Sequence, residues 1–207
     1  MIIKPSNYLQ CKKEGCSDIL RDNFMVPDLE VDTEKIKAIM IAEVPPENPY
    51  DYFYANTDGS YMKTTLQAFR DAGAEVDTIL DILNMGIYIT TAVKCAKVGY
   101  GIPTATVKYC KDILAEELKM FPNLQVYMLM GDVAIKAMNY IVKEETKKSV
   151  IPSGSTYKIR YNNYYYHGKR VIPSYLMTGG NYLIEKSKRV MIAQDIREML
   201  GIMNDRK

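Results

Sequence analysis

The residues with the clearest capacity for chemistry are four cysteines, which fall into two pairs, Cys11-x4-Cys16 and Cys95-x14-Cys110. Four thiolates suit either a tetrahedral zinc ion or an iron-sulfur cluster, and the spacing alone does not separate the two. In an intracellular chain, paired cysteines form a metal site more often than a disulfide framework, because cytosolic reductants keep thiols reduced. Buried cysteines without a metal are a third interpretation. We therefore expect Cys11, Cys16, Cys95 and Cys110 to be metal ligands.

A second candidate for chemistry is Glu43, which directly follows the apolar run at residues 36–42 and precedes Pro45-Pro46. The run predicts a buried strand, and the prolines predict a loop after it. Sites in parallel sheets lie at the carboxyl ends of strands, so a carboxylate at this position is a candidate catalytic group. The alternative is a solvated glutamate at the end of a strand.

Aromatic side chains follow Glu43, and others lie beside basic residues later in the chain. Rings next to cations suit stacking on bases and contact with phosphates, although an exposed tyrosine-rich hairpin in an ordinary sheet protein has the same pattern. The segment Thr178-Gly179-Gly180 suits either a loop that probes the minor groove of DNA or a flexible linker. The aromatic and basic residues are Tyr52, Phe53, Tyr54 and Tyr61 in the first group, and Tyr161, Tyr164, Tyr165 and Tyr166 with Lys158, Arg160, Lys169 and Arg170 in the second.

Composition sets few limits on the partner. The formal net charge is +2, from 27 basic and 25 acidic residues, so nothing global indicates a polyanion, while a local basic surface stays open. No run approaches the length of a membrane span, and residues 1–11 lack the apolar core of a signal peptide. We therefore expect a monomeric, cytoplasmic protein that does not enter a membrane, with one domain over residues 1–207 and a core that needs no metal to fold.

Alternating strands and helices predict the fold class. Apolar runs predict strands at 36–42, 87–91 and 125–130, and alternating residues predict strands at 156–166 and 169–175, joined by a turn at His167-Gly168. Apolar residues at helical spacing predict helices at 62–72, 104–118, 132–142 and 185–200. This order predicts an α/β protein with a central, mostly parallel sheet that helices flank on both faces. Cys110 then lies on a helix, and Glu43 lies at one edge of the sheet.

Four segments carry a resemblance to a known family. They are Ala42-Glu43-Val44-Pro45, Tyr88-Ile89-Thr90-Thr91-Ala92-Val93-Lys94-Cys95, Met130-Gly131-x2-Ala134 and Ile172-Pro173-Ser174-Tyr175-Leu176. With the two early cysteines, they make nearly the whole chain resemble the iron-sulfur (family 4) uracil-DNA glycosylases. The resemblance implies a four-stranded parallel sheet flanked by helices, and a [4Fe-4S] cluster on the four cysteines that ties an amino-terminal arm to the middle of the chain. The cluster is expected to be structural and to take no redox part in the reaction.

The resemblance also implies an activity and roles for single residues. The activity is removal of uracil or another deaminated base from DNA in base excision repair, by hydrolysis of the N-glycosyl bond. Glu43 matches the acidic position of the family's first motif, Thr91 the position of its base-reading Asn, and Phe53 or Tyr54 the ring that stacks on the flipped base. The residues expected to contact DNA are Lys94, Arg160, Lys169, Arg170, Thr178 and Gly179.

The chain departs from the family's motifs at positions that matter for catalysis. Ala42 and Pro46 replace the two glycines around the acidic residue, Thr91 replaces Asn, and Ile172 replaces the His of the His-Pro-Ser motif. The single histidine, His167, falls in the predicted hairpin turn. These differences keep open a second interpretation, a non-catalytic nucleic-acid-binding relative that retains the fold and the cluster. A zinc-stabilised α/β protein unrelated to DNA is a third.

Overall fold

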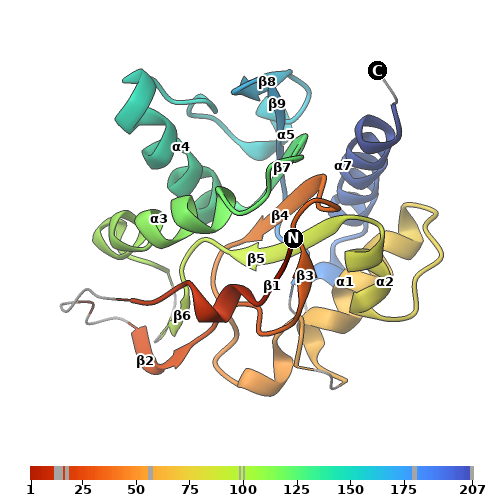
Figure 1. The fold of residues 1–207 in the computed structure, drawn as a ribbon. Coiled ribbons are helices and arrows are strands. Elements are labelled where there is room, and N and C mark those ends of the chain that lie inside the picture. The colour runs from red at the N-terminus through yellow and green to blue at the C-terminus, as the bar shows by residue number, and fades with distance from the viewer. Residues whose placement is uncertain are drawn as a thin grey trace.

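Five strands form the central sheet of the computed structural model, which describes residues 1–11, 16, 19–55, 58–97, 99, 101–178 and 181–205 (Figure 1). The order across the sheet is β5-β4-β7-β9-β8; the first four strands run parallel, and β8 is antiparallel to β9. This confirms the predicted α/β class, with a fifth strand because a hairpin adds β8 at one edge. The strands are β4 (Ala38–Ala42), β5 (Ile87–Thr91), β7 (Val126–Met130), β8 (Tyr164–Tyr166) and β9 (Lys169–Ser174).

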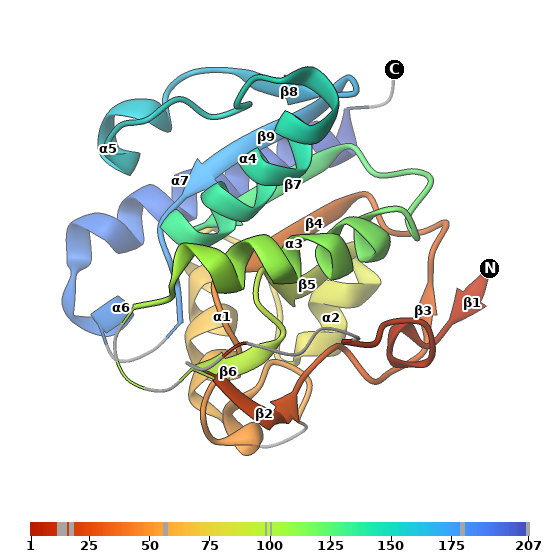
Figure 2. The same ribbon diagram turned by 90° about the vertical axis from the view of Figure 1, so that its left-hand side faces the viewer.

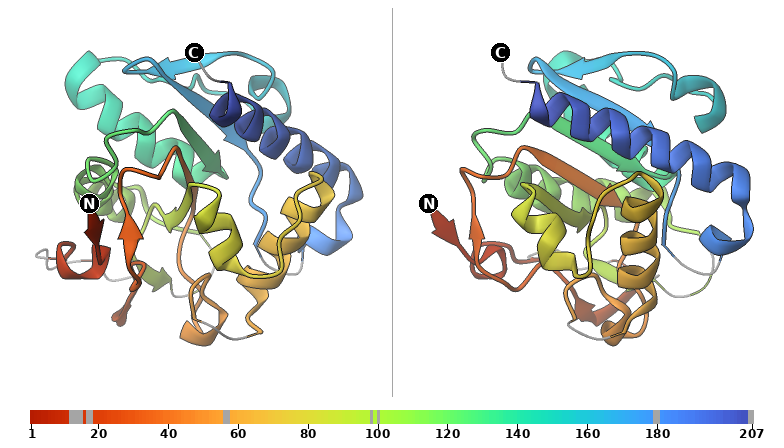
Figure 3. Two further views of the ribbon diagram at one scale, coloured as in Figure 1. Left: turned by 45° about the vertical axis from the view of Figure 1, so that its right-hand side comes forward. Right: turned by 90° about the vertical axis from the view of Figure 1, so that its right-hand side faces the viewer.

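Helices cover both faces of the sheet (Figures 2 and 3), and for this reason β4, β5 and β7 are buried along their whole length. Successive side chains of a strand enter opposite cores: Met40 and Met128 join one, and Ile41 and Leu129 join the other. The first core is closed by α1 (Ser60–Asp71), α2 (Ile79–Asn84) and α7 (Lys186–Asn204), and the second by α3 (Thr104–Leu118) and α4 (Asp132–Thr146). Within the described residues, no helix has the length and apolar character needed to cross a membrane.

The connections of the sheet change direction between β4 and β7. From β4 the chain passes through α1 and α2 to β5 on one side, and then through α3 to β7 on the other side of β4. The helices that follow β4 and β7 therefore cover opposite faces and leave a crevice beyond the carboxyl ends of these two neighbouring strands. Register places Ala42 level with the end of β7, and Met130 level with Ser174 of β9. Residues that follow these strands share one edge of the sheet.

The amino-terminal part of the chain lies against the segment that follows β5. Strand β1 (Ile2–Ile3) pairs with β3 (Val31–Asp32), and β2 (Ile19–Phe24) pairs with β6 (Cys95–Lys97), both antiparallel. A hydrogen bond of 2.6 Å from the Met25 amide to the Lys94 carbonyl extends the second contact. Short helices complete the chain at η1 (Pro5–Asn7), η2 (Pro49–Asp51) and α6 (Asn181–Ile184).

One predicted strand is wrong. Residues 156–161 were expected to be extended, but the structure has a short helix, α5 (Thr156–Ile159), after Ser155. The alternation of aromatic and basic residues suggested period two, whereas Thr156 and Ile159, three residues apart, are buried and Tyr157 and Lys158 are exposed. That is helical spacing. The strand itself begins later, at Tyr164.

Candidate functional site

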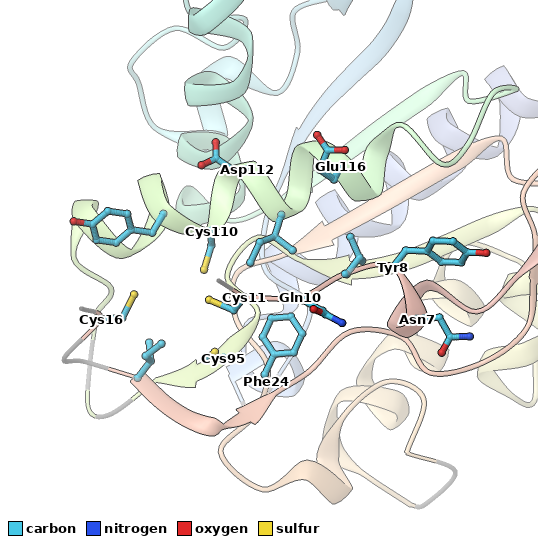
Figure 4. A pocket seen from close by; sticks show the side chains of 14 residues that line it. Asn7, Tyr8, Gln10, Cys11, Cys16, Phe24, Cys95, Cys110, Asp112 and Glu116 are labelled. Carbon is cyan, nitrogen blue, oxygen red and sulfur yellow. The ribbon is translucent and has the colours of Figure 1, made fainter. Parts of the chain in front are cut away.

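The four cysteines gather around one cavity of about 560 Å³. Cys95 begins β6 and Cys110 lies on α3, and both are buried, whereas Cys16 is partly buried and Cys11 exposed. Figure 4 shows the four side chains around a common space, with Phe24 beside them. The arrangement brings together two sequence-distant pairs, as the metal-centre interpretation requires.

The thiols that line this cavity bear on which group it fits. A single zinc ion needs thiolates at about 2.3 Å from one centre. Within the described ranges, no group of three or more His, Cys, Asp or Glu side chains is arranged to hold a metal ion. Four thiolates around one cavity provide the donor set of a [4Fe-4S] cluster as well as that of a zinc ion. The donor set therefore fits a [4Fe-4S] cluster.

The Cys110 thiol has an environment with opposing effects. Burial raises the pKa of Cys110, while the hydrogen bond from the Lys94 backbone N–H and the positive charge of Lys94 lower it. Apolar side chains of Leu9, Ile19 and Phe24 also line the cavity, and polar ones, among them Gln10 and Asp112, line other parts of it. A group bound there is shielded from water on the protein side.

A second cavity, of about 320 Å³, opens at the carboxyl edge of the sheet, where the connections change direction. Its lining comes from the segments after β4, β7 and β9 and from α5, α6 and α7. The charged lining residues are Glu43, Asp132, Glu185 and Lys188, and the others are Gly131, Thr156, Tyr175, Leu176, Thr178, Tyr182 and Ile192. Glu43 is therefore where the sequence predicted it, at the edge of the sheet and facing a cavity.

Glu43 is held against the amino end of α4. Its Oε1 accepts a hydrogen bond of 3.1 Å from the Val133 backbone N–H, and the dipole of this helix favours a carboxylate at its amino end. Gly131, with φ of 98°, makes the approach possible: a Cβ there would lie 2.5 Å from Glu43 Oε1. The glycine after β7 is thus required both by its backbone conformation and by the adjacent carboxylate.

Among the aromatic residues that follow Glu43 in the sequence, Tyr61 has surroundings that include Glu43, rather than the expected Phe53 or Tyr54. Burial raises the pKa of Tyr61, its hydrogen bond with Thr178 lowers it, and the negative charge of Glu43 raises it. Phe53 is fully buried and packs on Tyr61, with ring centroids 5.3 Å apart. The Tyr54 hydroxyl accepts a hydrogen bond of 2.9 Å from the Ile89 backbone N–H, a donor on the outermost strand β5. Phe53 and Tyr54 are therefore packing residues here. Tyr61 is the better candidate for the ring that would stack on a flipped base.

Thr91 does not reach this cavity. Its side chain is fully buried, and its hydroxyl has no hydrogen-bond partner among the described residues. The carbonyl oxygen of Thr91 accepts a hydrogen bond of 2.6 Å from Lys94 Nζ. The expected contact between Thr91 and a base is therefore not made in this conformation, because the strand end points the side chain into the core.

Most of the predicted DNA-contacting cations also lie elsewhere. Lys94 is fully buried in an ion pair with Glu117, and Arg160 and Arg170 are 5% exposed and paired with Asp195 and Glu198. Buried, paired cations offer no surface to a phosphate, so these three predictions are corrected.

Position along the sheet corrects a fourth prediction. Strand β9 begins at Lys169 and ends at Ser174, at the carboxyl ends of the strands where Glu43 also lies. Lys169 and Ser174 are about 16 Å apart along the strand. Lys169 therefore lies at the opposite edge of the sheet, beside a different cavity that Lys37 and Gln125 help to line. Thr178 does line the Glu43 cavity, and Gly179 lies outside the described residues.

Sequence reasoning missed the helix residues that complete the cavity. The Lys188 ammonium is 2.7 Å from Glu185 Oε2 and 5.5 Å from the centroid of the Tyr175 ring. Tyr175 directly follows β9, so its place at the edge was available from the strand prediction. The position of α7 over the carboxyl ends of the strands could not be predicted. Helical spacing shows which face of a helix is buried but not which element that face packs against.

The comparisons with known proteins do not add to this description. No protein-family model matches the chain, and a search of curated proteins finds no match.

Proposed function

We propose that the protein is a DNA glycosylase that removes uracil or another deaminated base from DNA. The observation that carries the proposal is the placement of Glu43: a carboxylate held by the amino end of α4, facing a cavity at the point where the sheet changes direction. Cleavage of an N-glycosyl bond develops positive charge on the sugar and negative charge on the departing base. A fixed carboxylate at the sugar stabilises the first charge or orients the attacking water.

The departing base also needs stabilisation, and the family's His is replaced by Ile172, which is fully buried. In this cavity two candidates are the Lys188 ammonium and the Tyr175 hydroxyl. Either can donate a hydrogen bond to a base oxygen as it gains charge. We assign this role to Lys188, because a cation stabilises the anion more strongly than a neutral donor.

DNA would approach over α5. Thr156 of this helix lines the cavity, and the neighbouring Tyr157 and Tyr161 are 59% and 65% exposed. Their rings form an edge-to-face pair with centroids 6.2 Å apart, and Arg160 lies 4.8 Å from the Tyr161 ring. Exposed rings of this kind stack on bases that flank a flipped nucleotide.

The cofactor we propose is a [4Fe-4S] cluster on Cys11, Cys16, Cys95 and Cys110, with zinc as the alternative. The convergence of the four cysteines on one cavity supports a four-thiolate centre, and the resemblance favours the cluster. When bound, it joins the amino-terminal arm to β6 and α3, and the reaction itself takes place at Glu43.

The test is release of free base from a uracil-containing oligonucleotide by anaerobically purified protein. Glu43→Gln should lower the rate on the order of 100-fold or more, because the charge at the developing cation is lost. Glu47→Gln, the same change on an exposed residue of the same loop, should keep the wild-type rate. Lys188→Met should also slow release, whereas Lys186→Met, on an exposed position of α7, should not. Unchanged release in the Glu43 variant would refute its role.

A non-catalytic nucleic-acid-binding relative is the second candidate. The apolar Ile172 in the position of the His and the burial of Thr91 favour it. It predicts that the wild-type protein binds a uracil-containing strand in a shift assay and releases no base from it.

A further inference from the structure

Lys94 is a lysine without any exposed surface. Its ammonium donates to Glu117 Oε2 at 2.5 Å, to Thr90 Oγ1 at 2.8 Å and to the Thr91 carbonyl at 2.6 Å. A lysine ammonium has three protons to donate, and all three have acceptors here. The group is therefore held in one position.

Glu117 is equally buried and equally well satisfied. Its Oε1 accepts hydrogen bonds from the Tyr88 hydroxyl at 2.8 Å and from Thr90 Oγ1 at 2.9 Å, in addition to the ion pair with Lys94. Strand β5 and helix α3 are thus joined through a closed polar network inside the protein.

One end of this ion pair adjoins a cysteine of the proposed metal centre in the sequence, and the other end lies on the same helix as a second cysteine. Lys94 immediately precedes Cys95. Glu117 follows Cys110 by two helical turns on α3, so Glu117 and Cys110 lie on the same side of that helix. The Lys94 carbonyl accepts from the Met25 amide of the amino-terminal arm. One residue therefore connects β5, α3 and the arm.

Net stability does not account for such a pair. Removing two charges from water costs about as much as their attraction returns, and apolar residues of similar size often serve a core equally well. What a closed, buried ion pair supplies is a fixed geometry between the segments that carry it. Here those segments are the ones that present Cys95 and Cys110.

We propose that Glu117 and Lys94 are positioning residues of the metal centre: their buried ion pair fixes Cys95 and Cys110 relative to each other before the metal group binds. The inference rests on the metal centre proposed above. It assigns no part in base removal to either residue, so it can fail while the proposed activity stands.

The test compares retention of the cluster in three folded proteins: the wild type, a double variant and a control variant. Lys94→Met with Glu117→Met removes both charges together and leaves no unpaired buried charge. Asp195→Asn is the control, because Asp195 forms a similarly buried ion pair, with Arg160, away from the cysteines. Iron and sulfide per chain, the electron paramagnetic resonance spectrum after reduction with dithionite and the rate of iron loss to a chelator are measured for each, with circular dichroism to verify folding.

The folded double variant should lose iron about tenfold or more faster than the wild type, as other supporting residues of metal sites do, with a broadened spectrum. Asp195→Asn should keep the wild-type rate and spectrum. Equal rates in the double variant and the wild type would overturn the inference. If the double variant does not fold, Glu117→Gln, which keeps the size and the hydrogen-bonding atoms, is measured in its place. Wild-type protein that binds neither iron with sulfide nor zinc would instead overturn the metal centre itself.

Discussion

The backbone N–H of Val93 donates a hydrogen bond of 3.0 Å to the carbonyl oxygen of Glu43. Val93 is followed directly by Lys94 and Cys95, so the segment that supports the candidate catalytic loop continues into the cysteine cavity. The two cavities are thus linked through a few residues of main chain. Changes at the proposed metal centre should therefore affect the position of Glu43.

Gly131→Ala should displace Glu43. The new Cβ would lie 2.5 Å from Glu43 Oε1, and the φ of 98° disfavours alanine as well. We expect a loss of unfolding free energy of about 1 kcal/mol from the backbone and a fall in base release on the order of 100-fold from misplacement of the carboxylate. The control is Gly168→Ala, where φ is 73° and nothing lies within 4 Å of the added Cβ. If both variants keep full activity, the close packing of Glu43 on Gly131 is not needed for the reaction.

Cys95→Ala should remove the bound metal group. Cys95 is buried between the arm and α3, so no neighbouring water replaces its thiolate easily. Iron and acid-labile sulfide analysis of anaerobically purified protein should show neither at the wild-type level. Full iron and sulfide content would remove Cys95 from the set of ligands, and zinc without sulfide in the wild type would decide for the alternative metal.

Tyr157→Ala and Tyr161→Ala should weaken binding to single-stranded DNA. Each exposed ring that stacks on a base contributes about 1–3 kcal/mol. Tyr165→Ala is a matched control, because Tyr165 is also 59% exposed but lies on β8, in the hairpin that leads to the opposite edge of the sheet. Fluorescence anisotropy with a labelled oligonucleotide provides the measurement. Equal affinity losses in all three variants would place the DNA elsewhere.

Asp71→Asn should lower stability in a pH-dependent way. Burial raises the pKa of Asp71. Hydrogen bonds from Arg189, Gln67 and Tyr182 and the charge of Arg189 lower it by more than burial raises it, so the pKa in the folded protein lies below the ordinary value of 3.8. A lowered pKa contributes stability above the unfolded pKa, and this contribution disappears as pH falls through the folded pKa. The variant should be about 1 kcal/mol less stable than the wild type near neutral pH. Urea unfolding at a series of pH values should show this difference shrinking below about pH 4; a constant difference would contradict the assignment.

Much of the fold was predictable because its signals are local. The apolar runs of β4, β5 and β7 indicate strands covered on both faces, and the predicted helices at 62–72, 104–118, 132–142 and 185–200 correspond to α1, α3, α4 and α7. The position of Glu43 after a central strand, and of Cys110 on a helix, followed from the same patterns. The segment at 156–161 was wrong because four helical residues are too few to distinguish a period of 3.6 from a period of two.

The sequence by itself determined the α/β class, the residue types available for a metal and the place of Glu43 at a strand end. Only the tertiary structure decided which charges are usable. Lys94, Arg160 and Arg170 look like surface cations in the sequence, but each has a carboxylate partner 23 to 35 residues away that allows it to be buried. Lys188 and Tyr175 meet for the same reason, since the packing of α7 across the sheet edge brings them together. Burial and charge pairing are properties of distant contacts, and local sequence patterns do not carry them.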